Sequence, residues 1–418
     1  MNVLHLSTFD FGGAGNAAVR IHQSLLERGY PSKMLIAYPR NQFSQCYKFE
    51  SRFSIISKAI KKIKYSSAFW NERERFNNLT LSRTGYFSFI DNPYFRCHQE
   101  LYDWADIIHL HWVSDFVDLK YLFEKCKSKK IVWTLHDMNP FTGGCHYSGN
   151  CMKYETDCIA CHQIQFSNFP KLSEYNLLQK SKIFSGVSSS QLKIVTPSEW
   201  LSECSKRSLL FKNFSHEVIP YGLNTEIFTI KDKFEAKKSI GIDTKKKVLL
   251  FVSENLSNTR KGFDLLVESL RFIDRKDEIM ICSVGAIDPS VLPEGIEYRS
   301  MGMVKSEEVM ASIYNASDFF VIPAREDNFP NVVIEAHACG LPVVGFATGG
   351  IKEMIDPGTN GLLAERESTS DFRDKILYML NNHDKFDRNS IRQKAIEKYS
   401  LEFQAIRYVN LYNSINRL

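Results

Sequence analysis

Short apolar runs alternate with helical stretches along the whole chain. The apolar runs lie at residues 3–6, 33–37, 107–110, 131–135 and 193–196 in the first half, and at 248–252, 279–284, 318–322 and 342–346 in the second. Apolar positions at helical spacing fill the segments between them, for example 263–272 and 332–339. This alternation predicts βαβ units, mostly parallel sheets and the α/β class.

The strand pattern starts afresh in the second half, which predicts two domains. A chain of 418 residues exceeds what one core usually organises. Turn residues gather in the segment 196–222, so we place the boundary near residue 200, with an N-terminal domain over 1–200 and a C-terminal domain over 201–399. The polar, helical tail at about 400–418 is expected to pack back on the first domain.

Composition narrows the class of protein. Hydrophobic residues make up 44% of the chain and charged residues 24%, as in a folded globule. The 53 basic and 48 acidic residues leave a net charge of +5, too small to indicate a nucleic-acid partner. The N-terminus carries no signal-peptide pattern and no long apolar run follows, so we expect a cytoplasmic protein with mostly reduced cysteines.

The segment 323–344 carries the first candidate chemistry. A strand ends at Ile322, an acidic loop follows, and Pro330 suits the first turn of the next helix. Helix N-termini beyond the carboxyl ends of parallel strands bind anionic ligands. Carboxylates there would repel phosphate, so Asp327 and Glu335 are better suited to accept hydrogen bonds from sugar hydroxyls. The alternative is a surface loop followed by a half-buried helical Glu.

Two adjacent cations, Arg260 and Lys261, lie in a loop between a strand and a helix. Fixed positive charge there would neutralise a diphosphate leaving group. The alternative, a solvated pair at a helix start, is opposed by the helix dipole.

A glycine-rich segment follows the first strand. Gly13, Gly15 and Ala18 match the dinucleotide-binding pattern, and Arg40 would contact a 2′-phosphate. Six residues, 7–12, separate Gly13 from the run ending at Leu6, which is farther than that pattern requires. An ordinary tight turn also remains open.

His136 and Asp137 follow the strand predicted at 131–135. A neutral imidazole both donates and accepts, so His136 would orient sugar hydroxyls or contact an acceptor. A structural histidine paired with Asp137 is the alternative.

Two further segments suggest a metal and a membrane. Four cysteines within 17 positions would suit a closed structural zinc site, with His146 and His162 as substitutes and free or redox-active thiols as the alternative. They are Cys145, Cys151, Cys158 and Cys161. Residues 54–65 form a basic amphipathic pattern that would contact an anionic membrane surface or a lipid-linked acceptor, or simply dock on the first domain.

Taken in order, these motifs resemble those of the retaining glycosyltransferases of family 4, which have the GT-B fold of two Rossmann-like domains facing across a cleft. The family signature has two acidic residues separated by seven others, matched by Asp327 and Glu335, although Asp replaces the commoner Glu at the first position. The family often has a cation five residues before its Lys-Gly pair, where this chain has Leu256.

The resemblance implies a role for each motif. Arg260 and Lys261 would stabilise the leaving diphosphate, Asp327 and the backbone after it would hold the donor sugar, and Glu335 would hold the ribose. His136 would reach the donor sugar, and the glycine loop would approach the donor phosphates. The donor-binding residues implied are Gly13, Gly15, Asn328, Phe329, Pro330, Asn331 and Glu335.

The implied activity is retaining transfer, without a catalytic metal or other required cofactor, of a sugar from a UDP- or GDP-sugar. The acceptor would be a glycan or an undecaprenyl-linked glycan in capsule, exopolysaccharide or O-antigen assembly, at the inner face of the plasma membrane. Two alternatives stay open: an NADP-dependent oxidoreductase, and a catalytically silent carbohydrate- or nucleotide-binding scaffold.

Overall fold

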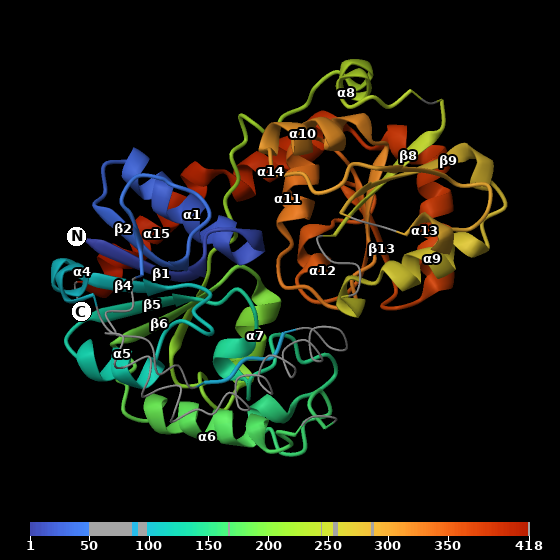
Figure 1. Cartoon of the computed structure of the whole chain (residues 1–418). Helices are drawn as coiled ribbons and strands as arrows, with labels where there is room; N and C mark the ends of the chain where they lie inside the picture. Colours follow the sequence, from blue (N-terminus) through green and yellow to red (C-terminus); the bar gives the residue numbers. More distant parts are fainter. Residues whose placement is uncertain are drawn as a thin grey trace, which may run out of the picture. The chain divides into compact units, whose positions relative to one another are not determined.

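The computed structural model describes residues 1–49, 86–90, 98–165, 168–243, 245–253, 258–285 and 288–416. It divides into two compact units (Figure 1). The N-terminal unit comprises Met1–Ile219 and Ala405–Leu418, and the C-terminal unit comprises Pro220–Gln404. The amphipathic segment predicted at 54–65 lies outside the described residues.

A seven-stranded, fully parallel sheet forms the centre of the N-terminal unit, in the order β3-β2-β1-β4-β5-β6-β7. Its strands are β1 (Val3–Phe9), β2 (Ser32–Tyr38), β3 (Cys46–Lys48), β4 (Ile107–Leu110), β5 (Lys130–Thr134), β6 (Leu192–Thr196) and β7 (Ser215–Val218). Because β7 pairs with β6, the sheet continues beyond residue 200 and the units divide at Ile219.

Helices cover the faces of this sheet (Figure 1). They are α1 (Gly12–Glu27), α4 (Gln99–Trp104), α5 (Leu119–Lys125), α6 (Leu172–Phe184) and α7 (Glu199–Arg207). The last helix, α15 (Leu401–Asn416), joins this unit from Ala405 onward. Tyr408 and Tyr412 of α15 are buried against Val3 and Ile107, which anchors the end of the chain on the sheet.

A six-stranded parallel sheet forms the centre of the C-terminal unit, in the order β10-β9-β8-β11-β12-β13. Its strands are β8 (Lys247–Val252), β9 (Ile279–Val284), β10 (Glu297–Ser300), β11 (Phe319–Ile322), β12 (Val343–Phe346) and β13 (Gly361–Ala364). Its helices are α8 (Lys233–Ser239), α9 (Phe263–Arg271), α10 (Glu307–Ala316), α11 (Asn331–Ala338), α12 (Ile351–Met354), α13 (Thr369–Asn382) and α14 (Arg388–Tyr399).

Both sheets reverse their strand order once. In the N-terminal unit the reversal lies between β1 and β4, and in the C-terminal unit between β8 and β11. Open parallel sheets bind ligands beyond the carboxyl ends of the strands at such a reversal. The loops after these four strands are therefore where functional side chains are expected. None of the described helices is both long and apolar enough to cross a membrane.

Candidate active site

Two cations and a carboxylate meet at the strand reversal of the C-terminal unit. The loop after β8 carries Arg260 and Lys261, and the loop after β11 carries Asp327. Arg260 Nη1 lies 3.0 Å and Lys261 Nζ 2.8 Å from the same oxygen, Oδ2 of Asp327. The sequence therefore identified three residues that the fold brings together, here called the Arg260–Lys261–Asp327 cluster.

The charge of Asp327 is stabilised by this pairing. Burial by itself would raise the pKa of Asp327, whose residue is only 6% exposed. Lys261 and Arg260 act in the opposite direction and hold the pKa of the carboxyl well below its ordinary range. The carboxylate thus stays ionised and fixes the positions of both cations.

Backbone contacts lock the two loops together. The Arg325 amide donates to the Arg260 carbonyl at 2.8 Å, and Arg260 Nη1 donates to the Glu326 carbonyl at 2.7 Å. Gly262 has a φ of +70°, and a Cβ there would lie 1.8 Å from the Pro323 carbonyl oxygen. Only glycine allows this approach. In the Lys-Gly pair, Lys261 therefore supplies the charge and Gly262 allows the two loops to come close.

A third loop, after β12, supports Asp327 and was not identified from the sequence. The Gly350 amide donates to the Asp327 carbonyl at 2.9 Å, and Thr348 Oγ1 donates to the Arg325 carbonyl at 2.8 Å. A Cβ at Gly349 would lie 2.1 Å from the Asp327 carbonyl oxygen. The sequence signal for this loop was the pair Gly349 and Gly350 after the strand predicted at 342–346. Neighbouring parallel strands bring the loops that follow them together, so this loop could have been placed next to that of Asp327.

Helix α11 begins beside the cluster. Pro330 is its N-cap, with φ −66° and ψ 119°, and Asn331 is its first residue. The Asn328 amide donates to Oδ1 of Asp327 at 2.9 Å. The Phe329 ring packs edge-on against Tyr221 and Tyr399, so its side chain belongs to the core. Phe329 therefore offers a ligand its backbone rather than its ring.

Glu335 lies one turn into α11 and is half-buried. Its Oε2 accepts a hydrogen bond of 3.0 Å from the Tyr314 hydroxyl. This contact fixes the carboxylate on the helix that starts at the cluster, and its assignment to the ribose remains a prediction.

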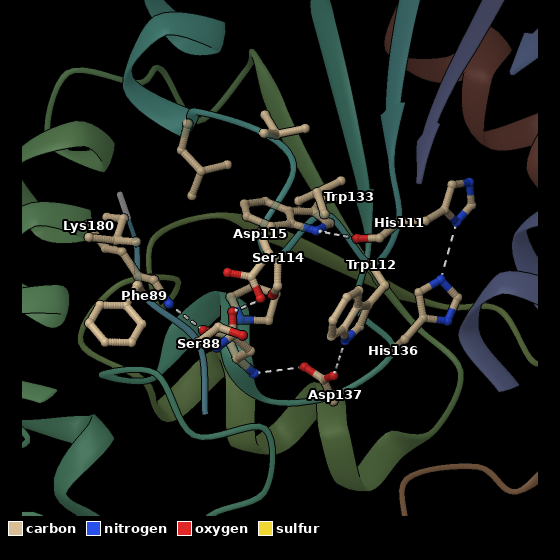
Figure 2. A pocket seen from close by; sticks show the side chains of 16 residues that line it. Ser88, Phe89, His111, Trp112, Ser114, Asp115, Trp133, His136, Asp137 and Lys180 are labelled. Atoms are coloured by element: carbon tan, nitrogen blue, oxygen red, sulfur yellow. Dashed lines mark hydrogen bonds between the residues drawn. The ribbon is translucent and has the colours of Figure 1, made fainter. Parts of the chain in front are cut away.

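The N-terminal unit has a pocket at its own strand reversal (Figure 2). The loop after β4 supplies His111 and Trp112, the loop after β5 supplies His136 and Asp137, and α6 supplies Lys180. Lys180 is buried, which lowers its pKa to about 8, and its ammonium donates to the carbonyl oxygens of Asn139 and Thr142.

Asp137 pairs with His146, and His136 bonds to His111. Asp137 Oδ2 lies 2.7 Å from His146 Nδ1 and accepts from Trp112 Nε1 at 2.7 Å (Figure 2 shows the indole contact). The far nitrogen of His146 lies 2.8 Å from the Ser88 hydroxyl. Burial tends to raise the pKa of Asp137, but His146 lowers it, with a net lowering.

His136 ends a buried chain of imidazoles. His5 Nδ1 lies 2.9 Å from His111 Nε2, and His111 Nδ1 lies 3.2 Å from His136 Nε2. Burial lowers the pKa of all three rings, that of His136 to about 4, so they are neutral at pH 7. His5 Nε2 has no hydrogen-bond partner among the described residues.

The unpaired Nε2 of His5 determines in which direction the hydrogen bonds run from ring to ring. A buried N–H without an acceptor is rarer than an unpaired acceptor, so we assign the proton of His5 to Nδ1. His5 then donates to His111, and His111 donates to His136 Nε2. The proton of His136 consequently lies on Nδ1, which makes that atom a hydrogen-bond donor.

The glycine loop begins α1 directly. Strand β1 extends to Phe9 and α1 starts at Gly12. The distance along the chain between the strand and the glycines is therefore shorter than the sequence indicated. Gly13 and Gly15 lie in the first turn, and a Cβ at Gly15 would lie 2.9 Å from the Asp10 carbonyl carbon. The Arg40 guanidinium lies over the Phe11 ring, 3.4 Å from its centre.

The four clustered cysteines line one cavity of the N-terminal unit. All four are free thiols. Among the described residues, the group of three possible metal ligands with all ligand atoms within 4.8 Å of one another is His5, His109 and His111. The sulfurs therefore surround the cavity without meeting at one point. Burial raises the pKa of Cys145, of Cys158 to about 11, and of Cys161.

Two parallel Rossmann-like units with charged groups at the strand reversals define a GT-B protein. Residues 246–382 match the family model "Glycosyl transferases group 1". An uncharacterized glycosyltransferase of Methanocaldococcus jannaschii is 31% identical over 30% of this chain and 36% of its own length. For this and the other first relatives, the matched part covers less than half of the relative.

Other similar proteins match most of the chain. WcaC of Escherichia coli K12, named as a colanic acid biosynthesis glycosyl transferase, is 21% identical over 88% of both chains. The Anabaena protein HepE, solved with UDP and glucose, has a TM-score of 0.65 at 14% identity, covering 99% of this chain and 100% of that one. These matches confirm the resemblance to family 4 and the GT-B fold.

Proposed function

We propose that this protein transfers a sugar from a nucleoside-diphosphate sugar to a hydroxyl acceptor with retention of anomeric configuration. The observation that carries the proposal is the Arg260–Lys261–Asp327 cluster, which lies at a strand reversal within the family-matched segment. The proposed donor, acceptor and mechanism all depend on this cluster.

Departure of the nucleoside diphosphate is the step that needs fixed positive charge. Arg260 and Lys261 would bind the diphosphate oxygens and stabilise the charge that develops as the glycosidic bond to the leaving group breaks. Asp327 holds both cations side by side before the donor arrives, and the diphosphate then competes with Asp327 for them. Two such cations serve the leaving group without a catalytic metal.

The remaining residues of the C-terminal unit would orient the donor. Asp327 and the backbone of Asn328, Pro330 and Asn331 would hold sugar hydroxyls at the start of α11, and Glu335 would hold the ribose. In a front-face displacement the departing diphosphate accepts the proton from the acceptor hydroxyl. The new glycosidic bond then forms on the face from which the diphosphate leaves.

The N-terminal unit would bind the acceptor. Its pocket presents Nδ1–H of His136, which would donate to a hydroxyl of the acceptor or the donor sugar. The first turn of α1, which contains Gly13 and Gly15, would approach the donor phosphates through its backbone.

The names of similar proteins support the substrate class. HepE was solved with UDP and glucose, and WcaC is named for colanic acid biosynthesis. We therefore favour a UDP- or GDP-sugar, a glycan or undecaprenyl-linked acceptor, and a cytoplasmic reaction in capsule, exopolysaccharide or O-antigen assembly.

A thermal-shift screen against UDP-, GDP- and ADP-sugars, followed by product detection with a lipid-linked acceptor, tests the proposal. A shift with one nucleotide sugar and a product of retained configuration would support it. Binding without turnover of any donor would favour a silent scaffold, and a fluorescence change with NADPH would favour an oxidoreductase.

A further inference from the structure

The cavity lined by four cysteines is not explained by sugar transfer. It lies in the N-terminal unit, where Cys145 and Cys158 are buried and Cys151 and Cys161 are half-buried. Besides the sulfurs, it is lined by apolar groups such as Phe87 and by the polar residues Lys153 and His162. Four soft ligand atoms around one cavity are the donor set that tetrahedral zinc prefers.

Hydrogen bonds hold the backbone of three of the cysteines at this cavity. The Thr142 hydroxyl donates to the Cys145 carbonyl at 2.6 Å, and the Ser173 hydroxyl donates to the Cys158 carbonyl at 2.8 Å. The Cys161 carbonyl accepts from the Ile164 amide at 3.3 Å. These contacts fix where the three residues enter the cavity wall.

The backbone around the last two cysteines is folded back on itself. Cys158 and Ala160 have positive φ values of 54° and 50°, a conformation that residues other than glycine rarely adopt. This bend brings Cys158 and Cys161 to the same cavity. Strain of this kind persists where the surroundings over-determine it.

We propose that Cys145, Cys151, Cys158 and Cys161 bind one structural zinc ion as thiolates. Binding converts four thiols and Zn²⁺ into a tetrathiolate complex of charge −2 and releases four protons. The sulfurs surround the cavity more widely than a bound ion requires, so the half-buried loops of Cys151 and Cys161 must close inward. A fully coordinated zinc leaves no position for water, so the site has no catalytic role.

The histidine group is a weaker candidate for the metal. Both ring nitrogens of His111 are already in hydrogen bonds, and so are those of His109, to Thr134 and Tyr412. A metal bound through one nitrogen of each ring would have to break one hydrogen bond of His111 and one of His109.

The zinc would also hold the acceptor side of the proposed enzyme in place. Cys145 directly precedes His146, whose ring bonds to Asp137, and the Gly144 carbonyl accepts from Asn139 Nδ2 at 2.8 Å. Loss of the ion should therefore loosen the pocket of the N-terminal unit while leaving the Arg260–Lys261–Asp327 cluster intact.

Metal analysis of the full-length protein tests this proposal independently of activity. The protein, reconstituted with Zn²⁺ and dialysed, is expected to retain about one zinc per chain by mass spectrometry. Co²⁺ in its place should give the intense visible bands of a tetrahedral thiolate site. Cys151→Ser and Cys161→Ser should lose the ion, whereas Cys46→Ser, which changes a half-buried cysteine elsewhere in the same unit, should keep it.

Three results would overturn the proposal. One is a wild-type protein that binds no zinc and whose four thiols all react with a thiol reagent in the native state. A second is a disulfide between any two of them, and the third is zinc that is lost in His5→Phe but kept in the cysteine variants. UDP binding measured on the same preparations keeps this test separate, because the donor residues lie in the other unit.

Discussion

Lys261 Nζ lies 2.8 Å from Oδ2 of Asp327. The residue assigned to the leaving group is thus paired, before any ligand binds, with the residue assigned to the sugar. A bound diphosphate must compete with Asp327 for Lys261 and Arg260. This competition gives the substitutions at the two positions opposite effects on nucleotide binding.

Lys261→Ala should lower kcat by roughly two to four orders of magnitude, because one preorganised charge on the leaving group is lost. Steady-state kinetics with the donor found by screening would measure this. Arg271→Ala is the matched control, since Arg271 is an exposed cation of the same unit that forms an ion pair with Glu268 on the same helix. Near-normal turnover of Lys261→Ala would refute the leaving-group assignment.

Asp327→Asn should separate binding from catalysis. Removing the negative charge releases Arg260 and Lys261, so UDP or GDP should bind as tightly as to the wild type or more tightly, while turnover falls. Calorimetric titration and kinetics on one preparation would show both. A parallel loss of nucleotide affinity and turnover would contradict the proposed competition.

Gly262→Ala should be far more destabilising than Gly358→Ala. Both glycines have positive φ, but a Cβ at Gly358 meets nothing within 4 Å, whereas a Cβ at Gly262 meets the Pro323 carbonyl. The Gly358 change should cost about 1 kcal/mol from backbone strain alone, and the Gly262 change about 3 kcal/mol or more. Thermal unfolding of the two variants checks this, and equal losses would contradict the close approach of the two loops.

The buried imidazoles should make the N-terminal unit acid-sensitive. The pKa values of His5, His109, His111 and His136 are lowered on folding, so the unfolded chain binds more protons below its histidine pKa near 6.5. Stability should therefore fall as pH drops from about 6.5 towards 4, by up to about 1.4 kcal/mol per pH unit for each histidine. Thermal unfolding between pH 7.5 and 5 would measure the slope.

Nitrogen-15 NMR of the histidine rings tests the assigned proton positions. The wild type should show His136 neutral and protonated on Nδ1 at pH 7. In His5→Phe, Nε2 of His111 loses its donor and becomes an unpaired acceptor, so His111 should keep its proton on Nδ1 and His136 should remain protonated on Nδ1. If the His136 ring of the wild type is protonated on Nε2, the hydrogen bonds run in the opposite direction, from His136 to His111 to His5.

The sequence predicted the central strands and the cluster but not the sheet edges. The inner strands are apolar throughout and stand out from their surroundings, whereas β3, β7 and β10 are half-exposed at the edges and carry polar residues. Short, polar edge strands lack the pattern that identifies a buried one.

The site residues that the sequence revealed are those that stand together in one short, recognisable motif. Arg260, Lys261 and Asp327 lie in recognisable loops between a strand and a helix. The support from Thr348 and Gly350, and the pairing of Asp137 with His146, arise from loops that only the folded sheet brings together. The direction of the Phe329 ring likewise depends on Tyr221 and Tyr399, which come from distant parts of the chain.

The central claim is that Arg260 and Lys261, which Asp327 holds side by side, bind the diphosphate of a nucleotide. Titration of the wild type, Lys261→Ala and Arg271→Ala with UDP and GDP at low salt tests it most directly. The account predicts that one nucleotide binds the wild type and Arg271→Ala equally and binds Lys261→Ala at least about ten-fold more weakly, a difference of about 1.4 kcal/mol. Equal affinity of all three proteins for the nucleotide would contradict it.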